Sequence, residues 1–296
     1  MYDGGGGNDT LRILSSASFF TGSVILSIER IEFNTGENAF ASFDASQFGS
    51  GVSLSATIDG NASAAFSDTL QISMGSMTSL NLSGLTMLDF SHPGDQVIII
   101  GDGAAETIIG TSVRDFIQGR GGNDSLNGGL GVDRMEGGDG SDTYFANVFN
   151  DVVFEINPNL ATGGTDTVNF TGTSGTFILS ANVERLILGG SSAINGTGSD
   201  LANIITGNGA ANILNGGIDA LSDTLTGGLG NDTYIINSAI DNIVELVGGG
   251  TADRAKVSLS FGGNKPNWLK QSGVPARAPQ GLRLAGMTVF GVCGNA

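Results

Sequence analysis

A nine-residue period is the feature that most constrains how this chain can fold. From Gly101 to Phe145 five nonapeptides follow one another without a slip: GDGAAETII, GTSVRDFIQ, GRGGNDSLN, GGLGVDRME and GGDGSDTYF. Each unit opens with glycine, its eighth residue is large and apolar, and its sixth is acidic, namely Glu106, Asp115, Asp124, Asp133 and Asp142. A glycine-rich linker would not keep two residue types at fixed offsets, so the period indicates a repeating structural coil.

The offsets predict a tight turn followed by a very short strand. Glycine tolerates positive φ and close backbone approach, and the last three residues form a strand whose middle side chain points inward. Two units complete one coil, and successive coils stack about 4.8 Å apart. A hard cation takes six to eight oxygen ligands, which one turn cannot supply and two stacked turns can. We therefore expect Ca²⁺ between alternate units, which pairs Glu106 with Asp124, Asp115 with Asp133 and Asp124 with Asp142.

Two of these units, GGLGVDRME and GGDGSDTYF, resemble the GGxGxDxUx repeat of the RTX (repeats-in-toxin) family, in which U is a large apolar residue, and GRGGNDSLN nearly matches it. The resemblance implies an all-β fold, a right-handed parallel β-roll or β-solenoid with Ca²⁺ in its glycine-rich turns, and export by a type I secretion system. It also implies that the sixth-position Asp bridges two ions and that turn carbonyls complete each site. The ligands implied in this way are Asp124, Asp133 and Asp142 with the carbonyls of Gly119, Gly121, Gly128, Gly129, Gly131, Gly137, Gly138 and Gly140.

Copies of the repeat also occur outside this run. Near the start, GGGGNDTL places Asp9 at the sixth position. From Gly198 the units GSDLANIIT, GNGAANILN, GGIDALSDTLT and GGLGNDTYI carry Asn203, Asn212, Asp223 and Asp232 there. We expect metal at Asp9, Asp223 and Asp232, with weaker sites where the partner is Asn, since Asn offers a neutral oxygen. An alternative is that the Asn residues hold their turns by hydrogen bonds.

A longer repeat overlies the short one. Tyr144, Asp151 and Glu155 recur as Tyr234, Asp241 and Glu245. The Glu-Arg pairs at 29–30 and 184–185 are expected to be solvated faces of strands. Residues 34–100 alternate small polar with apolar residues and keep no helical period, which indicates further β-solenoid coils.

These patterns divide the chain into seven segments. We expect a truncated repeat (1–14), a β-solenoid segment (15–100), the nonapeptide β-roll (101–145), a strand-rich connection (146–197), a second repeat cluster (198–235), a strand-rich repeat copy (236–261) and an atypical basic tail expected to be disordered (262–296).

Charge is distributed very unevenly. Residues 1–253 hold all 29 acidic residues and six of the twelve basic ones. A body this acidic repels itself without a bound cation and is a poor partner for nucleic acid or anionic membranes. Residues 254–296 hold the other six basic residues, with the single Trp and the single Cys. This end of the chain is either an export signal or an aberrant end; the second is favoured, because family signals are usually poor in basic residues.

Several kinds of chemistry lack the residues they need. One histidine, His92, excludes an HExxH zinc motif, and no G-x-S-x-G nucleophile elbow occurs. No apolar run is long enough to span a bilayer, and one Cys excludes a disulfide framework within the chain. We expect no enzymatic activity and no catalytic residues. We also expect Ca²⁺, in place of disulfides, to stabilise the fold.

The sequence therefore favours a calcium-binding β-roll module of a bacterial protein that is secreted or on the cell surface, and that folds on Ca²⁺ binding after type I export. Its expected partners are calcium ions and the secretion machinery. Two alternatives stay open: an accessory region of a secreted hydrolase or epimerase whose catalytic domain lies elsewhere, and a Ca²⁺-dependent adhesin or matrix protein that binds polysaccharide or a cell surface.

Overall fold

The computed structural model describes residues 2–14, 17–19, 25–33, 37–49, 52–62, 65–159, 161–219, 221–238, 240–245, 249–250, 252–257, 282–284 and 287–291. These residues form β-strands and turns, with one short 3₁₀ helix, η1 (Ala45–Gln47). Parallel strands stack as a β-solenoid, which confirms the predicted fold class. None of the described segments is a helix long and apolar enough to cross a membrane.

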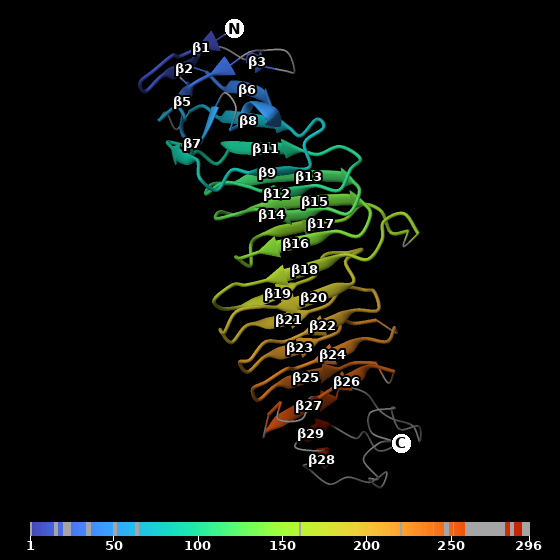
Figure 1. Cartoon of the computed structure of the whole chain (residues 1–296). Helices are drawn as coiled ribbons and strands as arrows, with labels where there is room; N and C mark the ends of the chain where they lie inside the picture. Colours follow the sequence, from blue (N-terminus) through green and yellow to red (C-terminus); the bar gives the residue numbers. More distant parts are fainter. Residues whose placement is uncertain are drawn as a thin grey trace. The chain divides into compact units, whose positions relative to one another are not determined.

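The chain divides into two units, and unit 1 comprises Met1–Phe145 and Asn150–Gly164. Its strands pair in parallel from coil to coil (Figure 1). The hydrogen-bonded orders are β1 (Tyr2–Asp3) with β4 (Ile25–Leu26); β10 (Thr86–Leu88), β7 (Val52–Asp59), β5 (Ile28–Phe33) and β2 (Thr10–Ile13); β17 (Val152–Phe154), β15 (Arg134–Asp139), β13 (Asp115–Gly121), β11 (Gln96–Ile100), β8 (Asp68–Ser73), β6 (Ala39–Asp44) and β3 (Ala17–Phe19); and β9 (Ser79–Asn81), β12 (Thr107–Ile109), β14 (Ser125–Asn127) and β16 (Thr143–Ala146).

Unit 2 comprises Ala146–Phe149 and Thr165–Ala296 and is built in the same way. One wall consists of β18 (Thr167–Phe170), β20 (Arg185–Leu188), β22 (Ile204–Thr206), β24 (Thr224–Thr226) and β26 (Asn242–Val244). The other consists of β19 (Thr176–Ile178), β21 (Asn195–Thr197), β23 (Ile213–Asn215), β25 (Thr233–Ile236), β27 (Asp253–Val257), β29 (Met287–Gly291) and β28 (Leu282–Leu284). β28 runs antiparallel to β29. The structure thus has two strands within 262–296, and the rest of that segment lies outside the described residues.

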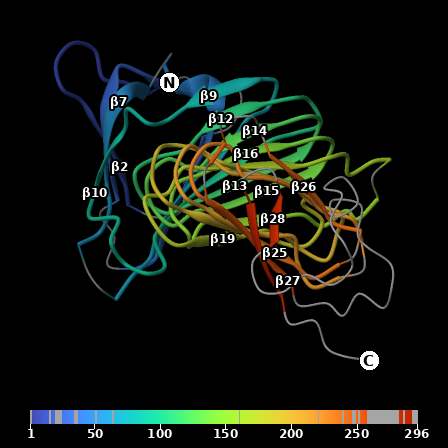
Figure 2. The ribbon, with the colours of Figure 1, turned by 90° about the horizontal axis from the view of Figure 1, so that it is seen from below.

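The core of unit 1 is a ladder of eighth-position side chains. Ile108, Leu126 and Tyr144 occupy the middle of β12, β14 and β16, lie in register, and are 0% exposed. Seen along the stack in Figure 2, β9, β12 and β14 follow one another along one wall. Burying three such side chains contributes about 1.5–3 kcal/mol each to folding. The apolar offset of the nonapeptide therefore sets which residue of each strand enters the core.

The turn glycines allow the coils to approach closely. Gly140 has a φ of 123°, and a Cβ atom there would collide with the carbonyl oxygen of Gly122 in the preceding coil. Gly131 has a φ of 125° and lies in the same way over the carbonyl of Val113. A larger residue at either position would strain the backbone and separate the coils.

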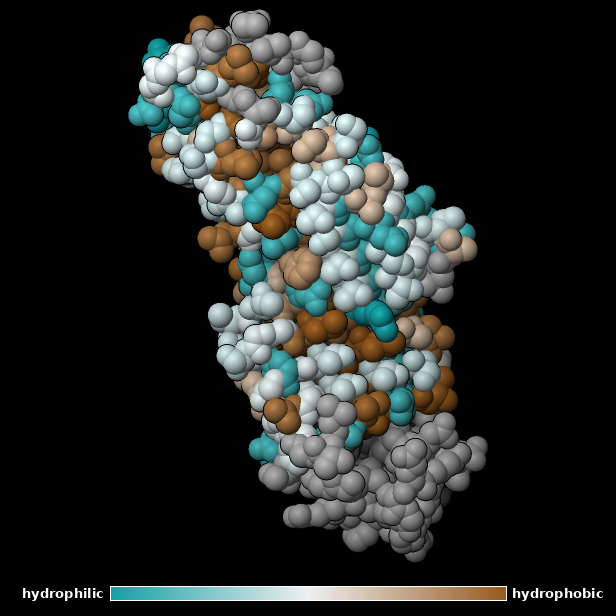
Figure 3. Space-filling model, in the orientation of Figure 1, coloured by the Kyte–Doolittle hydropathy of each residue, from teal (hydrophilic) through white to brown (hydrophobic). Residues whose placement is uncertain are grey.

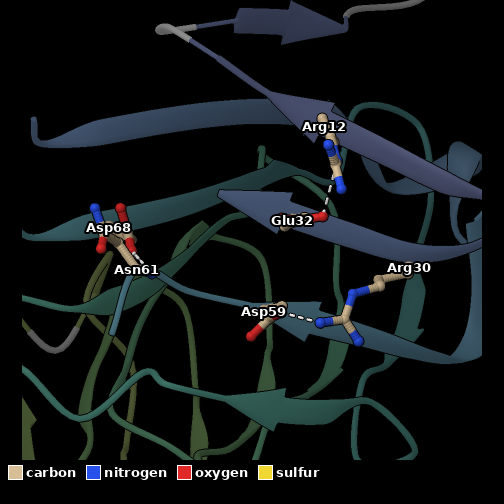
Figure 4. Close-up of polar contacts among 6 residues, drawn as sticks. All are labelled: Arg12, Arg30, Glu32, Asp59, Asn61 and Asp68. Carbon is tan, nitrogen blue, oxygen red and sulfur yellow. Dashed lines mark hydrogen bonds and ion pairs between the residues drawn. The ribbon is translucent and has the colours of Figure 1, made fainter. Parts of the chain in front are cut away.

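Ion pairs link the first coils of unit 1 (Figure 4). Arg12 pairs with Glu32 across β2 and β5 at 3.0 Å, and Arg30 pairs with Asp59 across β5 and β7. Glu29 instead accepts the backbone N–H of Asp9 at 2.9 Å. Glu184 likewise accepts the N–H of Asp166 at 2.8 Å. The interpretation of both Glu-Arg pairs as solvated strand faces is therefore wrong for the glutamates, which join neighbouring coils.

The outward strand positions give the surface a mixed character. On the face shown in Figure 3, apolar patches lie between hydrophilic rows. In unit 2, the outward residues Ile178, Ile187 and Ile213 are 64%, 41% and 41% exposed. These side chains are the residues that the inward ladder leaves free, since successive strand residues point to opposite faces.

Candidate metal centre

A ladder of acidic residues runs along the nonapeptide turns of unit 1. The backbone N–H of four successive sixth-position residues donates to a carboxylate oxygen of the sixth-position residue one coil further on. The donor–acceptor distances are 2.7–3.0 Å, and the pairs are Glu106 with Asp124, Asp115 with Asp133, Asp124 with Asp142, and Asp133 with Asp151. The three pairs predicted from the period thus lie together.

The second carboxylate oxygen of several ladder residues has no partner. In Glu106, Asp124 and Asp133 this oxygen is buried and accepts no hydrogen bond. The ion pairs of the described residues involve other acids, so no Lys or Arg neutralises these three. A buried oxygen without a donor is costly unless a cation or a proton occupies its free lone pair. These orphaned atoms are the ones that a bound cation would satisfy.

The first glycine of each unit forms a cradle around that oxygen. A Cβ atom on Gly119 would collide with Asp124 Oδ2, and one on Gly128 would collide with Asp133 Oδ2. The carbonyl oxygen of Gly137, one coil further on, lies 3.0 Å from the same point at Gly119. At Gly119 a carboxylate oxygen and a carbonyl oxygen of the next coil therefore lie close together, beside a glycine that leaves room for both. This donor set is the all-oxygen set that Ca²⁺ prefers.

The other predicted glycines have a defined place in the turns. Cβ atoms on the second-position and fourth-position glycines would meet carbonyl oxygens of the preceding coil, as at Gly129, Gly131, Gly138 and Gly140. Gly121 ends β13 and donates its N–H to the carbonyl of Asp102 at 3.2 Å. The structure thus shows why Gly129, Gly131, Gly138 and Gly140 are glycine, while the carbonyl ligation implied for all five positions stays a prediction.

Asp115 is satisfied within its own turn. Its Oδ2 accepts the backbone N–H of Thr111 at 2.7 Å and the Thr111 hydroxyl at 2.9 Å. Its Oδ1 accepts the same hydroxyl at 3.1 Å. Asp115 therefore differs from Asp124 and Asp133, because threonine in the second position of its unit supplies a hydroxyl donor that glycine does not have.

Burial raises the pKa of the ladder carboxyls. Burial, with neighbouring carboxylates as a smaller cause, raises the pKa of Asp133 and that of Asp142 to about 7. Burial, with Asp102 and Asp124 nearby, raises the pKa of Glu106 to about 8. The metal-free ladder thus holds its negative charge unfavourably near neutral pH, and a cation would remove that cost.

The second repeat cluster, in unit 2, shows two kinds of rung. The N–H of Asn203 donates to Asp223 and that of Asn212 donates to Asp232, both at 2.8 Å. The side-chain amide of Asn203 donates to the carbonyl of Val183 at 2.9 Å, and that of Asn212 donates to the carbonyl of Ile194 at 2.6 Å. The Asn amide thus binds a turn carbonyl directly, and the hydrogen-bonded Asn ladder is formed.

Asp223 and Asp232 keep the acidic kind of rung. Each has a buried Oδ2 without a hydrogen-bond partner. Each of these oxygens also lies where a Cβ on the first glycine, Gly216 or Gly227, would collide with it. Burial raises the pKa of both carboxyls to about 6. Asp9 has the same orphaned Oδ2, beside Gly4, in the first coil of unit 1.

The ladder also includes acids that the sequence reasoning did not identify. Asp151, Asp241 and Asp253 accept the N–H groups of Asp133, Asp223 and Asp232 at 3.0, 3.4 and 2.9 Å. The units of Asp151 and Asp241 lack the opening glycine, whereas that of Asp253, GGGTADRAK, keeps it. The signal present in the sequence is an acid two residues before a buried apolar residue, as in Asp151 before Val153, and it persists where the glycines are lost.

Comparison with known families agrees with this geometry. Residues 100–135, 128–153 and 197–234 match the model of the RTX calcium-binding nonapeptide repeat, in four copies. No curated protein matches the chain. The matched residues contain Asp124, Asp142 and Asp151 of the first cluster and Asp223 and Asp232 of the second, whereas Asp241 and Asp253 lie beyond them.

Proposed function

Given that this chain carries RTX calcium-binding nonapeptide repeats, we propose that it is the Ca²⁺-binding module of a secreted or cell-surface bacterial protein, and that it folds when Ca²⁺ binds after type I export. One observation carries the calcium part of the proposal. Buried, unpartnered carboxylate oxygens recur at the sixth position, each beside the opening glycine of its turn, and at Glu106 and Asp124 a carbonyl oxygen of the next coil lies beside the same glycine.

The residues that would hold the ion are those of the acidic rungs. Asp124 and Asp133, with their partners one coil away, offer charged oxygens, and the glycine-rich turns offer carbonyls. Calcium supplies positive charge for six to eight oxygens and tolerates irregular geometry. Binding would neutralise the ladder and fix the spacing between coils.

The proposed location outside the cell rests on the modest Ca²⁺ affinity of such sites. Extracellular calcium modules bind at roughly 10⁻⁴–10⁻³ M, so they stay empty inside a cell and fill outside it. The binding free energy then becomes folding free energy after export. Twenty-nine acidic residues in one chain favour this order, since the unneutralised chain resists compaction.

We further propose that the chain is a structural module and not a catalyst. The single histidine, His92, is bound by its own turn: its Nδ1 accepts the N–H of Gly94 at 3.0 Å and lies 3.1 Å from the Ser67 hydroxyl. The ladder carboxylates are engaged with backbone N–H groups between coils. These contacts support a structural role for both residue types, the histidine within its turn and the acids between coils. Incubation with p-nitrophenyl ester and glycoside substrates tests this, and turnover that purification cannot separate from the chain would contradict it.

Circular dichroism during a Ca²⁺ titration tests the calcium-dependent folding. We expect β content to rise cooperatively in the millimolar range, with Mg²⁺ at the same concentration producing a much smaller change because it demands rigid octahedral geometry. An unchanged spectrum across the Ca²⁺ titration would contradict the proposal.

A further inference from the structure

The coils of unit 1 have two sizes. Between β8 and β11, residues that face each other in neighbouring coils are 27 positions apart in the sequence, as in Leu70 beside Val97. Between β13 and β15 the separation is 18, as in Phe116 beside Arg134. The strands β7 and β10 form a further wall, which stands apart from the wall of β9, β12 and β14 (Figure 2). We refer to residues 28–100 as the wide coils and to residues 101–154 as the narrow coils.

The wide coils bury more apolar side chains than the narrow coils do. The coil from residue 70 to residue 96 encloses seven large apolar side chains, among them Leu70, Leu82 and Phe90, and each is at most 8% exposed. The coil from residue 108 to residue 125 encloses two, Ile108 and Ile117. The wide coil therefore buries more than twice as many such side chains per residue. Because apolar burial must offset the entropy lost by every ordered residue, the wide coils are the part of unit 1 that can fold on burial alone.

Aromatic contacts add to the core of the wide coils. Phe33 at the end of β5 packs edge to face against Phe90, which follows β10, with ring centroids 5.8 Å apart. Phe43 in β6 packs in the same way against Phe48, also at 5.8 Å. Such pairs stabilise a core beyond their buried area. None of these contacts involves a carboxylate, so they form equally well with and without a cation.

The wide coils also leave fewer buried acids in need of a cation. Asp95 has the same place in a rung as the ladder acids, because its Oδ1 accepts the N–H of Asp68 at 2.8 Å. Its Oδ2, however, accepts the N–H of His92 at 2.7 Å. Among the described residues of the wide coils, Asp68 Oδ1 is the one buried carboxylate oxygen without a hydrogen-bond partner. The narrow coils hold those of Glu106, Asp124 and Asp133.

We propose that the wide coils fold without Ca²⁺ and that their last strands are the template on which Ca²⁺ assembles the narrow coils. β11 pairs in parallel with β8 on one side and with β13 on the other, and β12 pairs in the same way with β9 and β14. Preformed edges at β11 and β12 fix the register of the next coil and remove the cost of first bringing distant residues together. The inference goes beyond the proposed function, which concerns Ca²⁺ binding by the nonapeptide turns.

Hydrogen exchange of the full chain, read by mass spectrometry of its peptides, tests the proposal in EGTA and then at rising Ca²⁺ concentrations. Without Ca²⁺ we expect amides of β6, β8 and β11 to exchange more slowly than those of β14 and β16 by about a hundredfold or more. Added Ca²⁺ should slow exchange in β14 and β16 and leave the other three strands nearly unchanged. Equal exchange in the two sets of strands without Ca²⁺ would overturn the proposal, whether both are fast or both are slow.

Two matched core truncations separate the template from the coils that it supports. Phe43 in β6 and Leu126 in β14 are both 0% exposed, and neither is a proposed ligand. Phe43→Ala should abolish the metal-free protection and raise the Ca²⁺ concentration at which β14 and β16 become protected by about tenfold or more. Leu126→Ala should raise only that Ca²⁺ concentration and leave the metal-free exchange as in the parent. An unchanged Ca²⁺ midpoint in Phe43→Ala would overturn the template role.

Phe43→Leu provides a second route if Phe43→Ala does not fold at any Ca²⁺ concentration. This milder truncation should weaken the metal-free protection and raise the Ca²⁺ midpoint by about threefold. Identical exchange in Phe43→Leu and the parent, with and without Ca²⁺, would contradict the proposal. Failure of the proposed function looks different, since β14 and β16 would then stay unprotected at every Ca²⁺ concentration while β6, β8 and β11 keep their metal-free protection.

Discussion

Replacing Asp124 by Asn should convert a metal-dependent rung into a metal-free one. Asp124 takes part in two successive rungs, because its Oδ1 accepts the N–H of Glu106 at 2.8 Å and its own N–H donates to Asp142 at 2.7 Å. Asn keeps the accepting oxygen and replaces the orphaned Oδ2 by an amide donor. Asn203 and Asn212 show that such an amide binds a turn carbonyl.

The magnitude follows from binding linkage. Above its Kd, each site that binds only the folded state adds about 1.4 kcal/mol to the free energy of unfolding for every tenfold increase in Ca²⁺. Loss of the two rungs that share Asp124 should therefore lower this slope by about 2.8 kcal/mol per tenfold. Without Ca²⁺ the substitution should instead raise the free energy of unfolding, because Asn removes a buried charge and adds a hydrogen bond that contributes about 1 kcal/mol.

Urea unfolding at a series of Ca²⁺ concentrations measures both quantities. Two comparisons sharpen the result. Asp223→Asn should reduce the slope by about half as much, because the partner of Asp223 in the preceding coil is the neutral Asn203. Asp200→Asn, on an exposed side chain of unit 2, should leave the slope unchanged. A slope for Asp124→Asn equal to that of the parent would refute the assignment of Asp124 to two calcium sites.

Three further predictions concern pH, the Asn rungs and the turns. The raised pKa values of Asp133 and Asp142 stabilise the metal-free fold at low pH, and this contribution is lost as pH rises from the ordinary value of 3.8 to about 7. Metal-free β content should therefore increase on acidification from pH 7 to pH 5, while Ca²⁺ affinity falls. A decrease in β content by circular dichroism would contradict the burial argument. Asn212→Asp should lower metal-free stability and add about 1.4 kcal/mol per tenfold Ca²⁺ to the unfolding slope, and an unaltered slope would show that the turn cannot take an ion. Gly140→Ala should lower the free energy of unfolding in urea at saturating Ca²⁺ by more than about 1 kcal/mol, because Gly140 has a φ of 123° and lies against the carbonyl of Gly122. The control Gly103→Ala, where a Cβ meets open space, should be close to neutral. Equal losses for the two variants would contradict the steric explanation.

The nine-residue period was sufficient to predict the β-solenoid and the contacts between alternate units. A side chain repeated at the eighth position must stack if each coil contains two units, and Ile108, Leu126 and Tyr144 do so. The pairing of Asp124 with Asp142 follows from the same arithmetic. Periodicity determines neighbours between coils because each residue contacts its own equivalent in the next coil.

The nine-residue period could not predict the contacts within a turn. Thr111 satisfies Asp115 through a local hydrogen bond that depends on the identity of one side chain. The ladder also continues through Asp151 and Asp241 without glycines, because a turn can be closed by other residues when its strand still stacks. The contact between Tyr234 and Glu245 joins residues of different units, and no fixed offset within a nonapeptide encodes it.

Crystals grown in millimolar Ca²⁺, with anomalous diffraction to locate the ions, test the central claim most directly. The account predicts an ion bound to Oδ2 of Asp124 and another to Oδ2 of Asp133, each also contacting turn carbonyl oxygens of a neighbouring coil. Ordered turns in which both oxygens contact only protein or water, with no anomalous peak beside them, would contradict it.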